Sequence, residues 1–461
     1  MHLTGTMKIN SRGNLEIGGM DTVDLAHEFG TPLWIIDEEG FRQNCRNIKK
    51  AFALYGDSQV LYASKTLATM AIYRIVEQEG LGLDVVSGGE LYTALKAGFP
   101  MQKVYFHGNN KSPEELRMAI CAGVARIVVD NFCELELLNQ LCTEENCQQE
   151  ILLRVTPGVE AHTHEYIQTG QIDSKFGFTL TDGQAMEGVK KALSMPGIKL
   201  VGLHCHIGSQ IFAMQSFQYT SSIMMDFWAE IKKTSGCQLE ELNLGGGLGI
   251  YYVAGDEPRK AEEWAEAVMP VVQEKARQHG LKVPRIIVEP GRAIAGPAGL
   301  TLYTLGSYKE VKGIRKYVAV DGGMTDNPRP ALYAAKYRAL LANKAVEKPE
   351  ETISIAGKCC ESGDMLIWDI ELPPVEAGDI LAVLATGAYN YSMSSNYNRL
   401  PRPAMVLVNQ GQAELIIKRE DYEDLLRNDL IPERLERDRG MFRLPCEQRP
   451  YPRGLKGHKQ R

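Results

Sequence analysis

Short apolar runs alternate with longer amphipathic stretches along the chain from about residue 58. Short β-branched or apolar runs are typical of buried strands, and stretches with a 3.6-residue apolar repeat are typical of helices that cover a sheet. The eight strands are expected at residues 60–65, 82–87, 104–108, 126–130, 151–157, 199–208, 241–247 and 285–291. Strands that alternate regularly with helices predict a parallel sheet, and repeats of this number and size predict a closed (β/α)8 barrel.

Helix start and stop signals lie between these runs. The stretch "SPEELRMAICAG" (112–123) offers Ser112 as an N-cap and Pro113 at the first helical position. A second amphipathic stretch, residues 259–280, ends on Gly280. Both signals place helices where a barrel needs them.

The pattern changes after about residue 295, where short β-rich runs are broken by Gly and Pro and no helices of matching length follow. This change predicts a second, mostly β domain. The strand-like N-terminal segment before the barrel is expected to join that domain. The expected limits are residues 1–35 for the N-terminal segment, 36–295 for the barrel, 296–440 for the C-terminal β domain and 441–461 for a basic tail.

Composition and charge narrow the function classes. The longest apolar runs are strand-sized, so no membrane partner is expected. A net charge of -7 argues against nucleic acid as a partner, because phosphate neutralisation needs clustered positive charge. The basic tail is expected to be solvated. No apolar stretch follows the charges near the start, so we expect a cytoplasmic protein whose 10 cysteines are thiols.

Candidate chemistry gathers at the carboxyl ends of the expected strands, where barrel enzymes carry their active sites. Lys65 ends the first strand, and a desolvated lysine there can form a Schiff base with an aldehyde, although a lysine can also simply reach solvent. The turns "NLGGGLG" (243–249) and "EPGR" (289–292) can expose backbone N–H groups to a phosphate, although tight turns explain most triple glycines. An aldehyde and a phosphate together indicate pyridoxal phosphate.

The stretch "GLHCHIGSQ" (202–210) raises the alternative of a metal site. On a strand, His204 and His206 share one face while Cys205 takes the other, so the three side chains do not converge on one ion. The remaining seven histidines and nine cysteines offer no partner at a spacing typical of zinc sites. We therefore expect no metal.

The chain resembles the diaminopimelate decarboxylases, which belong to the barrel-fold (fold type III) class of pyridoxal phosphate enzymes together with ornithine decarboxylase and alanine racemase. The resemblance covers residues 20–420 and depends on the order of its motifs, of which "DNPRPALY" and "CESGD" mark the amino-acid decarboxylase branch. These motifs are "YASK", "HCHIGSQ", "NLGGGLG", "EPGR", "DGGMTDNPRPALY", "CESGD" and "GAYNYSMSSNYN".

The resemblance implies residue roles around the cofactor pyridoxal 5'-phosphate. Lys65 would bind it covalently, His206 would stack on its ring, and His204 would be a neighbour with a hydrogen bond of its own. Glu289 would meet the pyridine nitrogen. The phosphate would be received by Ser209, Gly246, Gly247 and the "EPGR" backbone with Gly291 and Arg292, while Asp84, Arg154 and Tyr389 would add supporting contacts.

Glu289 bears on the reaction type. A carboxylate keeps the pyridine nitrogen protonated, so the ring can take up the electron pair that is left when an α-bond breaks. Related racemases place an arginine here, so Glu289 favours decarboxylation over racemisation. A surface glutamate before a Pro-Gly turn is the plain alternative.

The implied reaction converts meso-2,6-diaminopimelate into L-lysine and carbon dioxide. The distal carboxylate of that substrate calls for arginine, and Arg292 and Arg329 are candidates, with Tyr333 beside Arg329 and with Tyr389. Glu361 would take the distal ammonium. Either arginine could instead form a structural salt bridge. The alternatives are a sister decarboxylase of another amino acid or carboxylated polyamine precursor, a racemase, and a regulator without catalysis, against which Lys65 and Cys360 argue.

Adjacent cysteines in "GKCCESGD" face opposite ways on an extended segment, so at most one enters a site. The family position selects Cys360 as the proton donor to the product and leaves Cys359 as a buried thiol. Because Cys360 belongs to the β domain, it would reach a barrel mouth only in another subunit. A homodimer with shared active sites is therefore implied.

Overall fold

The structure, a computed structural model, describes residues 2–158 and 173–435. The chain forms two compact units, residues 1–419 and 420–461. The described part of the second unit contains one α-helix, α12 (Tyr422–Leu426), and a short 3-10 helix, Glu433–Leu435. The predicted basic tail, 441–461, lies outside the described residues.

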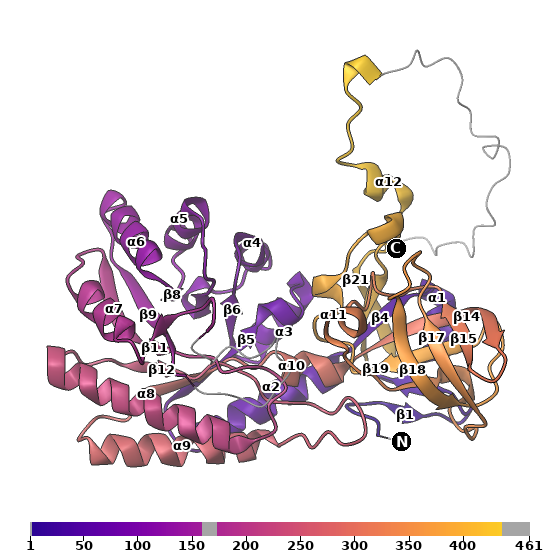
Figure 1. Cartoon of the computed structure of the whole chain (residues 1–461), viewed down its shortest axis with the longest axis horizontal. Coiled ribbons are helices and arrows are strands. Elements are labelled where there is room, and N and C mark those ends of the chain that lie inside the picture. The colour runs from indigo at the N-terminus through magenta and orange to yellow at the C-terminus, as the bar shows by residue number, and fades with distance from the viewer. Residues whose placement is uncertain (1, 159–172, 436–461) are drawn as a thin grey trace. The chain divides into compact units, whose positions relative to one another are not determined.

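Eight parallel strands of the first unit close into the predicted barrel (Figure 1). Its strands are β5 (Ser58–Ala63), β6 (Gly82–Val85), β7 (Val104–Phe106), β8 (Arg126–Val129), β9 (Gln149–Thr156), β11 (Ile198–His204), β12 (Glu241–Asn243) and β13 (Arg285–Val288). The pairing of β13 with β5 closes the ring. A short strand, β10 (Phe178–Thr179), pairs with β9 outside the ring. All eight predicted strands are confirmed, but most end two to four residues earlier than predicted, because their last residues turn into loops.

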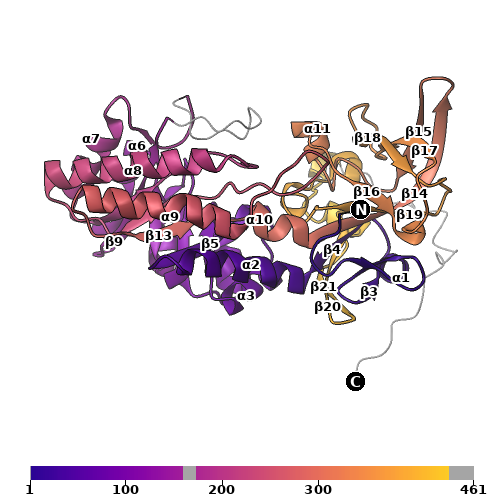
Figure 2. The ribbon, with the colours of Figure 1, turned by 90° about the horizontal axis from the view of Figure 1, so that it is seen from below.

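Helices surround the barrel. Their bounds are α2 (Glu38–Ala53), α3 (Met70–Gln78), α4 (Gly88–Lys96), α5 (Pro113–Ala122), α6 (Phe132–Glu144), α7 (Gln184–Leu193), α8 (Met214–Ser235), α9 (Ala261–Gln278) and α10 (Arg292–Ala295). The start of α5 is as predicted, since the Ser112 hydroxyl accepts from the Glu115 N–H and Pro113 follows it. Figure 2 shows α8 and α9 packed side by side along the barrel.

The barrel interior explains where polar side chains can lie. One apolar or aromatic residue from each of six strands forms an interior cluster: Leu61, Tyr105, Val128, Leu152, Val201 and Ile287. Because side chains on a strand alternate, the residue two positions farther on points to the same side, nearer the carboxyl end. After Tyr105, Leu152 and Ile287 these positions hold His107, Arg154 and Glu289, so the barrel changes from apolar to charged toward its carboxyl end.

The β domain holds a nine-stranded sheet. Its strands are β4 (Leu33–Asp37), β14 (Gly299–Val311), β15 (Arg315–Val320), β16 (Ala339–Leu341), β17 (Glu351–Ala356), β18 (Met365–Leu372), β19 (Ile380–Leu384), β20 (Ala404–Asn409) and β21 (Gln412–Ile417). The N-terminal segment adds a small sheet and a helix: β1 (Lys8–Ile9), β2 (Leu15–Ile17), β3 (Met20–Asp21) and α1 (Thr22–Phe29). A second short helix, α11 (Arg329–Tyr333), precedes β16.

Strand β4 joins the two domains. It pairs with β14 on one side and with β20 on the other, which confirms that the N-terminal strand belongs to the β domain. Leu33 and Ile35 pack into the core of the β domain, whereas Trp34 and Ile36 pack into the core around the barrel. Burial of both faces explains why this strand reads as an unbroken apolar run. The predicted domain limits themselves stay a prediction.

Within the described residues, no helix has both the length and the apolar character that a bilayer crossing requires.

Candidate active site

A cavity of about 220 Å³ lies at the carboxyl ends of the barrel strands, next to residues of the β domain. Its wall includes eleven of the residues that the sequence predicts for the site: Lys65, Asp84, His206, Ser209, Gly247, Glu289, Gly291, Arg292, Arg329, Tyr333 and Tyr389. Four others, Arg154, Gly246, Cys360 and Glu361, do not line it. The roles of all these residues stay predictions.

Lys65 lies in a single 3-10 turn directly after β5, and its side chain is open to the cavity. Burial acts to lower the pKa of its amine, but Tyr389, Asp84 and Glu289 outweigh burial and the pKa is raised. The free amine is therefore an ammonium that two carboxylates face, and it must release its proton before it can attack an aldehyde.

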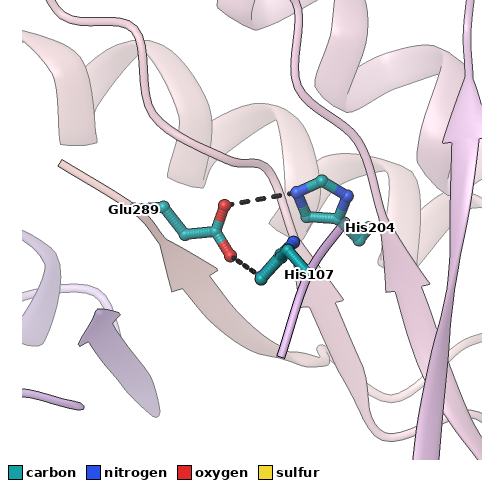
Figure 3. Close-up of side chains that lie close together, drawn as sticks. All are labelled: His107, His204 and Glu289. Carbon is teal, nitrogen blue, oxygen red and sulfur yellow. Dashed lines mark hydrogen bonds and ion pairs between the residues drawn. The ribbon is translucent and has the colours of Figure 1, made fainter. Parts of the chain in front are cut away.

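Glu289 follows β13 and is held by side chains at the ends of three other strands, of which Figure 3 draws His107 and His204. Its Oε2 lies 3.2 Å from His204 Nε2, and its Oε1 lies 2.9 Å from His107 Nε2. Asn243 Nδ2 donates to Oε1 at 2.6 Å. Burial acts to raise the pKa of Glu289, but the two imidazoles lower it well below its ordinary value. Glu289 is therefore a buried carboxylate and not the surface residue of the plain alternative.

Asp84 lines the cavity beside Glu289, and Arg154 lies behind it. Burial raises the pKa of Asp84, whose Oδ1 accepts no hydrogen bond from the described residues and lies 3.8 Å from His107 Nε2. Arg154 lies behind the wall, with Nε 3.8 Å from Asp130 Oδ1 and its guanidinium 4.1 Å from the centre of the Phe176 ring. Arg154 thus acts on the cavity through charge.

The glycine turns after β11 and β12 leave no room for side chains. A Cβ at Gly246 would lie 2.1 Å from the Glu289 carbonyl oxygen, and one at Gly247 would lie 2.6 Å from the Gly208 carbonyl oxygen. The Gly246 N–H donates to His206 Nδ1 at 3.2 Å, so this N–H orients the histidine ring. Burial, followed by Lys65 and Arg154, lowers the pKa of His206 well below its ordinary value, which keeps the ring neutral.

Two buried arginines meet at the hydroxyl of Tyr252. Arg292 Nη1 donates to it at 2.8 Å and Arg329 Nη1 at 3.1 Å, while Arg329 also donates to Tyr337 at 2.7 Å. Arg292 further donates to Ser209 Oγ through Nε and Nη2. Neither arginine forms a salt bridge with a carboxylate among the described residues, so the structural alternative is not favoured. The pair offers positive charge to an anionic group of a ligand.

Tyr389 brings the β domain to the barrel mouth. Its N–H donates to the Thr66 carbonyl next to Lys65, and its ring lies 4.9 Å from the Arg292 guanidinium. Its φ of 68° is uncommon for an aromatic residue, and such strain is frequent at functional sites.

Cys359 is buried and Cys360 is exposed, as the alternation of an extended segment predicts. The Cys360 N–H donates to Asn398 Oδ1 at 2.6 Å, and the Tyr397 hydroxyl donates to Glu361 Oε2 at 3.4 Å. The "CESGD" motif therefore lies beside the end of the "GAYNYSMSSNYN" motif. In one chain, these residues stand outside the wall of the cavity.

Four further side chains of the site were not predicted from the sequence: His107, Asn243, Tyr252 and Tyr337. His107 had a usable signal, because it follows β7 in the same way as Glu289 follows β13. The Ser87 hydroxyl accepts from the Glu90 N–H at the start of α4 and serves as a helix cap.

The residues present fit pyridoxal phosphate. An amine, a buried carboxylate and a flat neutral imidazole face one cavity, and the glycine turns form a cradle that any side chain would fill. Asp84 Oδ1, which has no hydrogen-bond partner within the described residues, adds a buried acceptor beside the cavity.

Comparison with known proteins identifies the family. Residues 38–296 match the family described as pyridoxal-dependent decarboxylase, pyridoxal binding domain. Diaminopimelate decarboxylase of Bacillus subtilis (strain 168) is 54% identical over 431 residues, which cover 93% of this chain and 98% of that protein. The chain belongs to the diaminopimelate decarboxylase family. As predicted, it is a pyridoxal phosphate-dependent carboxy-lyase.

Solved structures agree with membership of the diaminopimelate decarboxylase family. Diaminopimelate decarboxylase from M. jannaschii in co-complex with L-lysine has a TM-score of 0.88 and 38% identity, covering 94% of this chain and 100% of that chain. Lysine/ornithine decarboxylase from Vibrio vulnificus complexed with putrescine has a TM-score of 0.73 at 21% identity, covering 84% and 98%, and shares the fold.

Proposed function

We propose that this chain decarboxylates meso-2,6-diaminopimelate to L-lysine in the cavity at the barrel mouth. The observation that carries the proposal is the meeting of Lys65, Glu289 and the arginine pair Arg292 and Arg329 in one wall. Lys65 supplies a covalent link, Glu289 supports the cofactor ring, and the arginines recognise a carboxylate that lysine and ornithine do not carry at their distal ends. The similarity to diaminopimelate decarboxylases supports this substrate.

When bound, pyridoxal phosphate supplies a ring that takes up the electron pair of the departing α-carboxylate. Lys65 would hold the cofactor covalently, and His206 would pack on its ring. The backbone turns at Gly247 and Gly291, with Ser209, would receive the phosphate. Glu289 would keep a proton on the pyridine nitrogen. Tyr389 closes the mouth beside Lys65.

Arg292 and Arg329 bind the distal carboxylate, with Tyr333 at the cavity wall. The Tyr252 hydroxyl, which accepts from both guanidiniums, keeps these like charges close together. The two arginines lower the pKa of this buried hydroxyl, although burial acts to raise it. The hydroxyl oxygen accepts from both cations at once and so holds them in place, and the pair is ready before the substrate arrives.

A substrate panel tests this function. Purified protein is expected to release carbon dioxide from diaminopimelate and none from lysine or ornithine, measured with product chromatography. Arg329→Lys is expected to raise KM for diaminopimelate about tenfold with kcat little changed, because lysine lacks the planar fork that binds a carboxylate through two bonds. Arg338→Lys is the matched control, since Arg338 lies nearby but outside the cavity wall and donates to backbone oxygens. A preference for lysine or ornithine would instead indicate the sister decarboxylase.

We further propose a cytoplasmic homodimer in which the partner subunit's Cys360 and the partner subunit's Glu361 complete each cavity. After carbon dioxide leaves, the Cys360 thiol donates its proton to the substrate carbon, and Glu361 binds the distal ammonium. Exposure of both residues outside the cavity of their own chain supports this arrangement. The nine cysteines of the described residues are free thiols, which is typical of a reducing compartment.

Hybrid dimers test the shared site. Lys65→Ala and Cys360→Ala proteins are each expected to be inactive, but a refolded equal mixture should recover about a quarter of native turnover. Half of its dimers are hybrids, and each hybrid has one site with both native residues. A mixture of Lys65→Ala with Glu289→Gln is the control, since both changes lie in the barrel, so each barrel of a hybrid carries one change and no turnover beyond that of Glu289→Gln should return. If the first mixture regains nothing although hybrid dimers form, Cys360 acts in its own chain or not at all.

A further inference from the structure

The carboxylate of Glu289 stands between side chains that no proposed step uses. His107 follows β7, His204 ends β11 and Asn243 ends β12, so residues from three strands meet at one carboxylate. Figure 3 draws the two histidines beside Glu289. Oε1 faces Asn243 Nδ2 and His107 Nε2, whereas among the described residues Oε2 has one such neighbour, His204 Nε2. Because a carboxylate oxygen can accept two hydrogen bonds, Oε2 keeps one position for a further donor.

The orientation of Asn243 is fixed independently. Its Oδ1 accepts from the Gly245 N–H at 2.9 Å, so its Nδ2 is the atom that faces Glu289. Glu289 thus meets a true N–H donor on Oε1. This bond limits rotation of the carboxylate about its last torsion.

His204 is suited to donate without a charge. Burial lowers its pKa to about 4, so its ring is neutral at neutral pH. Its Nδ1 has no hydrogen-bond partner within the described residues, which leaves Nε2 as the nitrogen that carries hydrogen toward Glu289. The His107 and His204 rings also pack edge to face, with centres 4.8 Å apart and planes at 72°, so each ring limits the movement of the other.

These contacts stabilise the ionised form of Glu289 in a buried site that disfavours charge. A buried carboxyl beside a second buried carboxylate, Asp84, would otherwise take up a proton. We propose that His107 and His204 are positioning residues, which keep Glu289 a carboxylate and direct it at the pyridine nitrogen of the cofactor. This inference rests on the proposed function, in which Glu289 meets that nitrogen.

A metal ion is the alternative for this cluster, because one nitrogen of each histidine and one oxygen of Glu289 lie within 4.8 Å of one another. The Asn243 amide argues against it. Its hydrogen atoms point at Oε1, where a cation would repel them. The cluster is therefore better matched to a carboxylate that receives hydrogen bonds than to a metal.

The experiment measures the affinity of the apoenzyme for pyridoxal phosphate and for its 1-deaza analogue, in which C–H replaces the pyridine nitrogen. His204→Phe is expected to weaken binding of the natural cofactor about tenfold, the usual effect of losing a hydrogen bond to a charged group. Binding of the analogue should change less than about twofold, because it has no nitrogen for Glu289 to meet. His107→Phe should act in the same direction, and His204→Gln should restore part of the lost affinity through its amide N–H.

Tyr105→Phe is the matched control. It removes another buried donor to a carboxylate, the 3.0 Å bond to Glu241, from the same barrel interior but away from Glu289. It should weaken the cofactor and the analogue equally, if at all, as a purely structural effect would.

The outcomes distinguish the positioning role of the two histidines from the proposed contact of Glu289 with the cofactor. If Glu289→Gln distinguishes the cofactor from the analogue but His204→Phe and His107→Phe do not, the histidines have no positioning role. If Glu289→Gln itself does not distinguish them, the proposed contact of Glu289 with the cofactor fails first. Stoichiometric zinc in the purified apoenzyme, lost in His204→Phe, would also overturn the inference. Should His204→Phe fail to fold, His107→Phe provides the same comparison.

Discussion

Lys65→Ala protein is expected to lose both its bound cofactor absorbance and its turnover, by more than about a thousandfold. The reason is that Lys65 is the amine in the cavity wall that can link the cofactor covalently, and its ammonium is stabilised by Asp84 and Glu289. Carbon dioxide release and the visible spectrum measure the two losses. After borohydride reduction, mass spectrometry of the native protein should place the adduct on Lys65.

Lys103→Ala is the control for this change. Lys103 directly precedes β7, at the end of the barrel opposite the cavity, and is half-buried. Its replacement should leave the spectrum and turnover unchanged. An active Lys65→Ala enzyme, or an adduct on another side chain, would contradict the assignment.

The barrel could be predicted because its strands are buried on both faces, which leaves unbroken apolar runs in the sequence. Where each strand ends could not be read in the same way. The run "KLVGLHCHIG" continues beyond His204, but β11 ends there: the Cys205 N–H still bonds to the carbonyl of Asn243, the last residue of β12, and the chain then turns into a loop.

The same limit applies to the active site, where single residues could be predicted from the sequence but contacts between distant residues could not. Lys65, Glu289 and Arg292 could be found because each follows a strand end or belongs to a motif. His107 follows a strand as well, but nothing in the sequence says that its partner is Glu289, 182 positions away, and the same is true of Tyr252 and the arginine pair. Such pairs depend on which strands become neighbours.

Glu289→Gln is expected to lower kcat for diaminopimelate about a hundredfold or more while the cofactor stays attached to Lys65. The amide has the same shape but no charge, so it cannot keep the pyridine nitrogen protonated, and the ring becomes a weaker acceptor for the electron pair of the departing carboxylate. If its oxygen still accepts from Asn243, its NH2 group would face His204 Nε2, the nitrogen that donates to the native carboxylate. The spectrum should therefore persist while turnover falls, unlike Lys65→Ala, where both are lost.

Glu241→Gln separates this effect from the loss of any buried charge. Glu241 is as buried as Glu289, but it lies toward the other end of the barrel interior, where it pairs with Arg126 at 2.8 Å and accepts from Tyr105. Breaking that pair should lower the thermal unfolding temperature, because it leaves the Arg126 charge without its partner, and kcat should stay within about twofold. If both variants lose turnover in proportion to their loss of stability, the carboxylate at 289 serves the fold and not the reaction. A fall in kcat confined to Glu289→Gln, with a normal unfolding temperature, would place its charge at the cofactor.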